Sequence, residues 1–198
     1  MDGAAGRVRG GGMTFYRIAA IGLAVAMFAL TGCAKGESAA GAPKADAEMP
    51  VAAAEVKTVA DYFPIHVGDK VVRVQIAATM PEMQRGLMGR AFIAADEGMV
   101  FLYEKPQQMS FWMRNTPTAL DIGFFQADGT LGEIYQMYPF DETPVSSLGD
   151  DYTLALEMNQ GWFGKHELKP GAKISLKELA AALRARGFRP EKFGVPAE

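Results

Sequence analysis

Short apolar runs separated by turn residues dominate the chain from about residue 62 onward, and this pattern predicts β-strands. Phe63–Val67 and Lys70–Ala77 flank Gly68-Asp69, a two-residue loop that suits a hairpin, and Asp128-Gly129 is a second hairpin signal. We predict further strands at residues 99–103, 109–114, 120–126, 130–138, 152–158 and 172–176. About seven or eight strands with little helix between them predict a mainly β, compact sandwich or barrel-like domain.

Two segments carry helix signals instead. Thr79 and Glu82 have capping-box spacing, with proline in the first turn, which predicts one short inserted helix ending at Gly86 or Gly89. Residues 175–178 repeat the capping pattern, and an apolar stripe follows it at Leu176, Leu179, Ala180 and Leu183. We predict that this C-terminal helix packs on the edge of the domain, while a partner-binding helix is the alternative.

The N-terminal part has a different character. The apolar run from Ile18 to Leu30 follows Arg17 and is shorter than the roughly 20 residues of a membrane span, which is typical of a cleaved signal peptide. It ends in Leu-Thr-Gly-Cys, a sequence that looks like a bacterial lipoprotein processing site with acylation at Cys33. The alternatives are a buried thiol or an uncleaved anchor. Met13, which opens a compact basic leader, is a second possible start besides Met1.

Composition then divides the rest of the chain. Residues 34–54 are rich in Ala, Gly, Pro and charged residues and contain almost no large apolar ones, which predicts a flexible tether. We therefore expect a signal peptide at 1–32 and an acylated cysteine with its tether at 33–54. The β-rich domain is expected at 55–177, and the C-terminal helix and tail at 178–198.

Charge and reactive residues narrow the function classes. The net charge is −3, and removal of residues 1–32 takes away three arginines and one aspartate, so the mature chain is more acidic still. An acidic chain lacks the basic face that nucleic acid requires. Acylation would occupy the only cysteine, and the two histidines, His66 and His166, have no metal-ligand spacing. We expect neither a metal site nor a cofactor.

Three segments carry most of the unusual chemistry, at residues 82–90, 109–121 and 154–161. They contain E-M-Q-R-G-L-M-G-R, F-W-M-R-N-T and L-E-M, with G-M-V-F at 98–101 and L-D-I at 120–122. In this order the segments resemble the domain of unknown function 192 family from about residue 71 to 176. The resemblance implies a small β-rich, sandwich-like fold, often with export or membrane attachment, and an unassigned activity.

The same segments supply the candidate ligand-binding residues, which are Arg85, Arg90, Trp112, Asn115, Asp121 and Glu157. Each carboxylate lies between apolar neighbours and would need a partner if it faced a cleft. In one interpretation an arginine pairs with a carboxylate and holds the short helix on the sheet. In the other, the charges surround a concave ligand site together with Trp112 and Asn115.

Three functions compete at this point. The first is a non-catalytic, lipid-anchored binding or accessory module of the cell envelope for a glycan, a small ligand or an envelope protein. The resemblance to Gram-negative lipoproteins, in which a residue other than Asp after the cysteine usually goes with outer-membrane sorting, implies from Ala34 the outer membrane facing the periplasm. The second is a hydrolase that uses Asp121 and Glu157 as a carboxylate pair. The third is copper handling by methionines, of which the chain has twelve, although methionine usually fills apolar cores.

Overall fold

The computed structural model describes residues 55–197, so the expected signal peptide, the tether and Cys33 lie outside the described residues. The described part contains eight strands, three helices and one 3₁₀ turn. The strands are β1 (Phe63–Val67), β2 (Lys70–Ala77), β3 (Glu97–Gln107), β4 (Ser110–Phe111), β5 (Leu120–Gln126), β6 (Leu131–Met137), β7 (Val145–Ser146) and β8 (Tyr152–Asn159). The helices are α1 (Met80–Arg85), α2 (Trp162–Lys165) and α3 (Leu176–Ala185), and the 3₁₀ turn is η1 (Pro190–Phe193). Within these residues, no helix is both long enough and apolar enough to span a bilayer.

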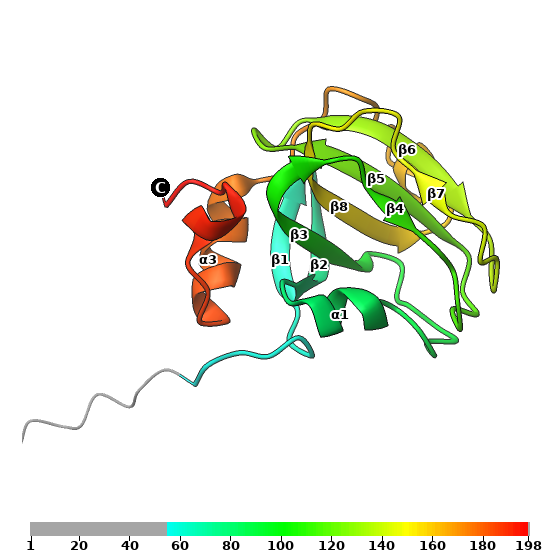
Figure 1. Cartoon of the computed structure of the whole chain (residues 1–198), viewed down its shortest axis with the longest axis horizontal. Coiled ribbons are helices and arrows are strands. Elements are labelled where there is room, and N and C mark those ends of the chain that lie inside the picture. Colours follow the sequence, from blue (N-terminus) through cyan, green and yellow to red (C-terminus); the bar gives the residue numbers. More distant parts are fainter. Residues whose placement is uncertain (1–54, 198) are drawn as a thin grey trace, which may run out of the picture. The chain divides into compact units, whose positions relative to one another are not determined.

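Six strands form one curved sheet in the order β1-β2-β3-β8-β5-β6 (Figure 1). All its neighbouring strands are antiparallel except β2 and β3, which are parallel and are connected through α1. The short strands β4 and β7 pair separately as a two-stranded ribbon. The prediction of a mainly β, sandwich-like domain is confirmed, and the described strands do not close into a barrel.

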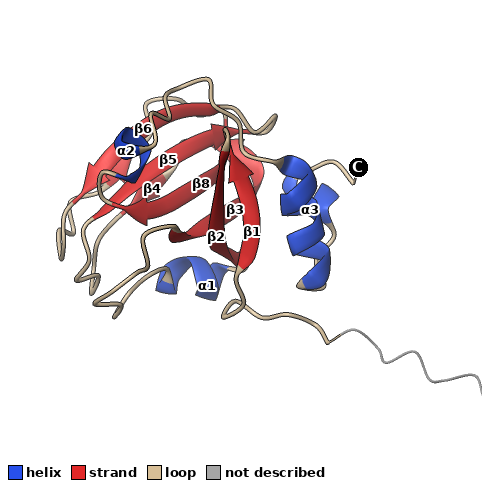
Figure 2. Ribbon diagram, turned by 180° about the vertical axis from the view of Figure 1, so that it is seen from behind, coloured by secondary structure: helices blue, strands red, loops and turns tan. Residues whose placement is uncertain are grey.

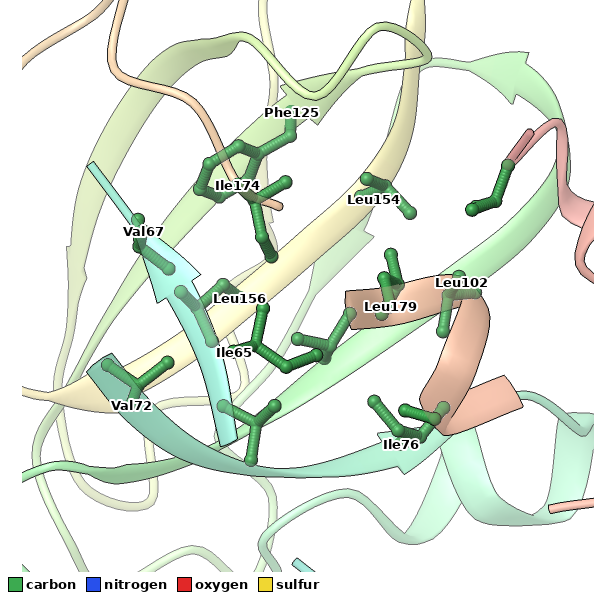
Figure 3. Close-up of a cluster of buried hydrophobic side chains, with 14 of the residues drawn as sticks. Ile65, Val67, Val72, Ile76, Leu102, Phe125, Leu154, Leu156, Ile174 and Leu179 are labelled. Atoms are coloured by element: carbon green, nitrogen blue, oxygen red, sulfur yellow. The ribbon is translucent and has the colours of Figure 1, made fainter. Parts of the chain in front are cut away.

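Both faces of the large sheet are buried. One face carries the cluster drawn in Figure 3, which contains Ile65, Val67, Val72, Ile76, Leu102, Phe125, Leu154, Leu156, Ile174 and Leu179. The helix α3 and the turn η1 belong to this side, where α3 packs beside β1 (Figure 2). The opposite face carries a second cluster around Phe101 and Phe124, to which the residues after α1 and around β4 contribute. Because a strand alternates its side chains, the two clusters take alternate positions of the same strands.

The C-terminal helix is confirmed, and it is part of the domain core. The Ser175 hydroxyl accepts a hydrogen bond from the Glu178 amide at 3.3 Å, as the capping pattern predicts. Leu179 and Leu183 are fully buried, and Phe193 of η1 joins them. Burial of a large apolar side chain contributes roughly 1.5–3 kcal/mol, so these residues stabilise the sheet that they cover.

Two of the predicted strands are wrong in extent or in kind. The predicted strand at 109–114 is reduced to the two residues of β4, because the chain turns directly afterwards, where Asn115 has a φ of 53°. The predicted strand at 172–176 makes only two isolated bridges, Val67 with Ile174 and Thr130 with Lys173. The short strand β7 was not predicted.

Candidate functional site

A cavity of about 170 Å³ opens beneath α1, and we call it the α1 cavity. The helix α1, the segment 86–88 that follows it, the strands β3 and β4, and Glu157 of β8 line it. Its walls are rich in thioethers, from Met80, Met83 and Met88, and in aromatic rings, from Phe101, Tyr103, Phe111 and Trp112. Such walls suit an apolar ligand with some polarisable or aromatic character.

The sequence builds the roof of the cavity through the capping box at the start of α1. The Glu82 carboxylate accepts hydrogen bonds from the backbone amides of Ala78 and Thr79, both at 3.0 Å. The helix ends at Gly86, whose φ is 46° and whose missing side chain would lie 3.4 Å from the Phe101 ring. A glycine is needed here because other residues rarely adopt this backbone conformation.

The charged residue that holds α1 in place comes from the end of α3. Arg186, which is almost fully buried, pairs with Glu82 at 2.5 Å and also donates to the backbone carbonyl of Ile76. Burial would raise the pKa of Glu82, but the hydrogen bond from Arg186 and the backbone amide of Ala78 outweigh it and lower the pKa. This ion pair performs the structural role that the sequence analysis considered for Arg85 or Arg90.

Neither of those two arginines pairs with Asp121 or Glu157. Arg90 donates to the Gln75 side-chain oxygen at 2.5 Å and to the Tyr62 hydroxyl at 3.2 Å. Arg85 is exposed at the rim of the α1 cavity. Arg90 lines a neighbouring cavity of about 450 Å³ that shares Arg85 with the first.

Glu157 lies at the floor of the α1 cavity, in the centre of the sheet. The residue is 5% exposed, and no hydrogen bond or ion pair joins its carboxyl to another described residue. Burial raises the pKa of Glu157 to about 8, and the positive charge of Arg90 opposes this only in part. Burial, together with the charge of Glu157, also raises the pKa of Tyr103 in the same cavity. The floor therefore presents a carboxyl that has no partner within residues 55–197.

Asp121 projects from the other face of the sheet. In the pairing of β5 with β8, Ile122 lies opposite Glu157 whereas Asp121 lies opposite Met158. Cross-strand neighbours share a face, so the Asp121 and Glu157 carboxyls point in opposite directions. Asp121 accepts a hydrogen bond from the Gly161 amide at 2.8 Å and so holds the start of α2. A hydrolase built on these two carboxylates is excluded, because both must flank one scissile bond.

Trp112 and Asn115 have different environments. Trp112 lines the cavity, is 48% exposed, and has the Arg114 guanidinium 5.8 Å from its ring centroid. Asn115 occupies the turn after β4, where its carbonyl accepts from the Gly89 amide at 2.8 Å, and it does not line the α1 cavity. The cavity therefore brings together Arg85, Trp112 and Glu157, and it leaves out Arg90, Asn115 and Asp121.

Comparison with known proteins places this fold in a family. The family model of DUF192, described as uncharacterized ACR, matches residues 64–176. The chain belongs to the DUF192 family. No curated protein matches the chain.

Two solved structures resemble this DUF192 domain, both with a TM-score of 0.56. A protein of unknown function from Novosphingobium aromaticivorans is 36% identical, and the match covers 63% of this chain and 94% of that chain. A protein described as a putative transcription regulator from Sinorhizobium meliloti is 26% identical, and the match covers 58% of this chain and 92% of that chain.

The DUF192 motifs meet at the α1 cavity. Residues of the segments 82–90 and 111–116, which carry the family resemblance, line it together with Glu157 of the L-E-M motif. Sequence reasoning missed the three methionines and Tyr103 as lining residues. The spacing of Met80 and Met83 indicates that they share one helix face, but only the tertiary fold brings that face to the same cavity as Glu157. Among the described residues, no group of three or more His, Cys, Asp or Glu could hold a metal ion.

Proposed function

We propose that this DUF192 domain is a non-catalytic binding module of the cell envelope that holds a small ligand in the α1 cavity. One observation carries the proposal, namely the buried Glu157 carboxyl, which faces the cavity without a partner among the residues that the structure describes. A buried carboxyl is costly unless a partner or a proton compensates it. A ligand group that bonds to Glu157 would supply that compensation.

The size and the walls of the cavity indicate what kind of ligand would fit. An apolar cavity of about 150 Å³ can hold benzene, so a cavity of about 170 Å³ suits a body of about one ring. Trp112 at the mouth gives a larger partner a surface on which to stack. A glycan chain or an envelope protein would then place a single terminal group in the cavity.

The cellular location belongs to the same proposal. The lipoprotein-like processing site at Cys33 and the composition of residues 34–54 support a domain that is tethered to a membrane, in the outer membrane facing the periplasm. A binding module in that position would capture its ligand in the periplasm.

The binding proposal is tested by NMR on protein labelled with ¹³C at the methionine methyl groups. Single-ring fragments should shift the methyl signals of Met83 and Met88, which line the cavity, and leave that of Met137 unchanged. Trp112→Ala should weaken fragment binding several-fold. Phe92→Ala, which removes an aromatic ring that is 81% exposed and lies outside the cavity, is the matched control. The proposal fails if a broad fragment set shifts no cavity methionine.

A second candidate function is Cu(I) handling. The specific observation in its favour is that Met80, Met83 and Met88 line one cavity, because thioethers are ligands that Cu(I) prefers. If it is correct, the protein should compete for Cu(I) with a chromogenic chelator, and a variant with all three methionines changed to leucine should not. Equal behaviour of the two proteins would dismiss copper.

A further inference from the structure

The charges around the α1 cavity are unevenly distributed. At its floor lies the Glu157 carboxyl, and no cation pairs with it among the described residues. The Arg90 guanidinium is bound to Gln75 and Tyr62, and Arg85 is exposed to solvent at the rim. The end of a bound ligand that reaches the cavity floor would therefore meet an acidic group.

The walls favour a positive charge in the same place. The rings of Phe101 and Phe111 meet edge to face, with centroids 5.0 Å apart, so this part of the wall is preorganised. Tyr103 and Trp112 add further aromatic rings, and a cation within about 6 Å of such a ring face is attracted by it. An apolar wall alone would favour a neutral hydrocarbon, whereas the carboxyl at its base favours a body that ends in a cation.

We propose that the α1 cavity is selective for amines, whose protonated nitrogen donates a hydrogen bond to the Glu157 carboxylate while a small aromatic or aliphatic body contacts the aromatic and methionine side chains. This inference rests on the proposed binding function and specifies its ligand class. Binding releases one proton, because the ammonium replaces the carboxyl proton as the partner of Glu157 and that proton passes to the buffer.

Amine binding should therefore depend on pH. The pKa of Glu157 is raised to about 8, so most carboxyls hold a proton at pH 6 and 7. Affinity for the amine should rise by about tenfold per pH unit from pH 6 to 7 and then level off near pH 8. The other ionisable groups that line the cavity are Tyr103 and Arg85, with Arg90 next to it, and both histidines lie elsewhere in the fold. Between pH 6 and 8 the dependence should come from Glu157.

The experiment is calorimetric titration of the full-length protein in detergent with ligands that differ only in their head group. The first series is benzylamine, benzyl alcohol and benzoate, and the second is butylamine, butanol and butyrate. We expect the amine to bind at least tenfold more tightly than the alcohol in at least one series. Repeating the titration in buffers of different ionisation enthalpy at pH 7 should show the release of nearly one proton per amine.

Two variants complete the test. Glu157→Gln keeps the size of the side chain but cannot ionise, so it should lower amine affinity at least tenfold and remove the pH dependence. Glu142→Gln, at an exposed acid that does not line the cavity, should change neither. Circular dichroism and thermal unfolding verify that both variants fold.

Each outcome separates this inference from the proposed function. If the alcohol binds as tightly as the amine, or if Glu157→Gln binds the amine unchanged, the amine inference is wrong while a binding cavity remains. Tightest binding of benzoate or butyrate would instead indicate an anion site governed by Arg85. If neither series binds and no cavity methionine shifts in the NMR experiment, the binding function itself is rejected.

Discussion

Glu157 lies on β8, which pairs with β3 on one side and with β5 on the other. A carboxyl in the middle of a sheet is costly to ionise, because the surrounding strands and side chains leave it little contact with water. The protein accepts this cost at the floor of its α1 cavity and not at an arbitrary core position. A costly buried carboxyl that lines a cavity therefore supports a binding role for Glu157.

The same residue predicts how stability depends on pH. A carboxyl whose pKa rises on folding destabilises the folded state wherever the unfolded chain would already have lost its proton. With an ordinary value of 4.5 and a folded value of about 8, Glu157 should lower the free energy of unfolding progressively as the pH rises from 4.5 to 8. At about 1.4 kcal/mol per pKa unit, the loss by pH 8 is roughly 3–5 kcal/mol.

Glu157→Gln should remove that loss. Urea unfolding at pH 5 and pH 8 should show the variant gaining stability relative to wild type at the higher pH, whatever its stability at pH 5. Glu142→Gln, with its side chain in solvent, should follow the wild-type profile. Parallel profiles for wild type and Glu157→Gln would mean that the carboxyl is not buried as described.

The strand pattern could predict that Asp121 and Glu157 each point away from their apolar neighbours. It could not predict on which face of the sheet each carboxyl lies. The register decides it, because Asp121 lies opposite Met158 and not opposite Glu157. A shift of one residue in this pairing would have placed the two carboxyls on one face. Asn115 does not line the cavity either. Its positive φ makes it a turn residue after β4. Arg85, Trp112 and Glu157 come from three separate sequence segments, and the fold brings all three to one cavity.

For helices and strands, local sequence patterns predicted most of the structure, whereas contacts between residues far apart in the sequence could not be predicted. The capping box of α1 and the Gly68-Asp69 hairpin occur as the sequence predicts, because each depends on residues within one turn. At α3 only half of the predicted box forms, because Ser175 caps the helix while the Glu178 carboxylate accepts a hydrogen bond from the His66 amide. The pair of Glu82 with Arg186 joins α1 to the end of α3 across more than a hundred residues. No local pattern distinguishes Arg186 from the exposed arginines of the chain.

That pair predicts a large stability effect. Removing one partner of a buried ion pair typically costs about 3–5 kcal/mol, because the other charge stays buried without compensation. We expect Arg186→Met to lower the free energy of unfolding by about 3 kcal/mol, and hydrogen exchange of the α1 amides to accelerate. Arg189→Met, at an exposed arginine near the same end of the chain, should have little effect.

A double-mutant cycle isolates the pair from other effects of the substitution. Once Glu82 has been changed to glutamine, the further change of Arg186 to methionine should cost less than it does in the wild type. Equal costs in both backgrounds would show that the two side chains do not stabilise each other.

At the scale of the whole molecule, the folded part extends beyond the match to the DUF192 family. The family model ends at residue 176, where α3 begins, yet α3 and η1 supply Leu179, Leu183 and Phe193 to the core and Arg186 to the support of α1. Residues 178–198 were predicted to form a separate helix and tail. In the structure the buried residues of α3 and η1 belong to the same core as the sheet, so the site depends on them.

Cys33 is predicted to attach the protein to the membrane. If its thiol carries a diacylglyceryl group, the protein expressed in a Gram-negative host should incorporate an alkyne-labelled palmitate and sediment with membranes. The label should resist neutral hydroxylamine, because the thioether, oxygen-ester and amide links of a lipoprotein anchor survive a neutral treatment that cleaves thioesters. Cys33 is the only cysteine in the chain, so no other thiol can account for the label.

Cys33→Ser should abolish labelling and leave a precursor of higher mass, because the signal peptide would not be removed. Ser38→Ala, a change within the predicted tether, should be labelled and processed like wild type. An unlabelled wild-type protein, or normal processing of Cys33→Ser, would reject the lipoprotein prediction. The calorimetric tests of the α1 cavity would remain valid in that case, because they depend only on the folded residues that follow the tether.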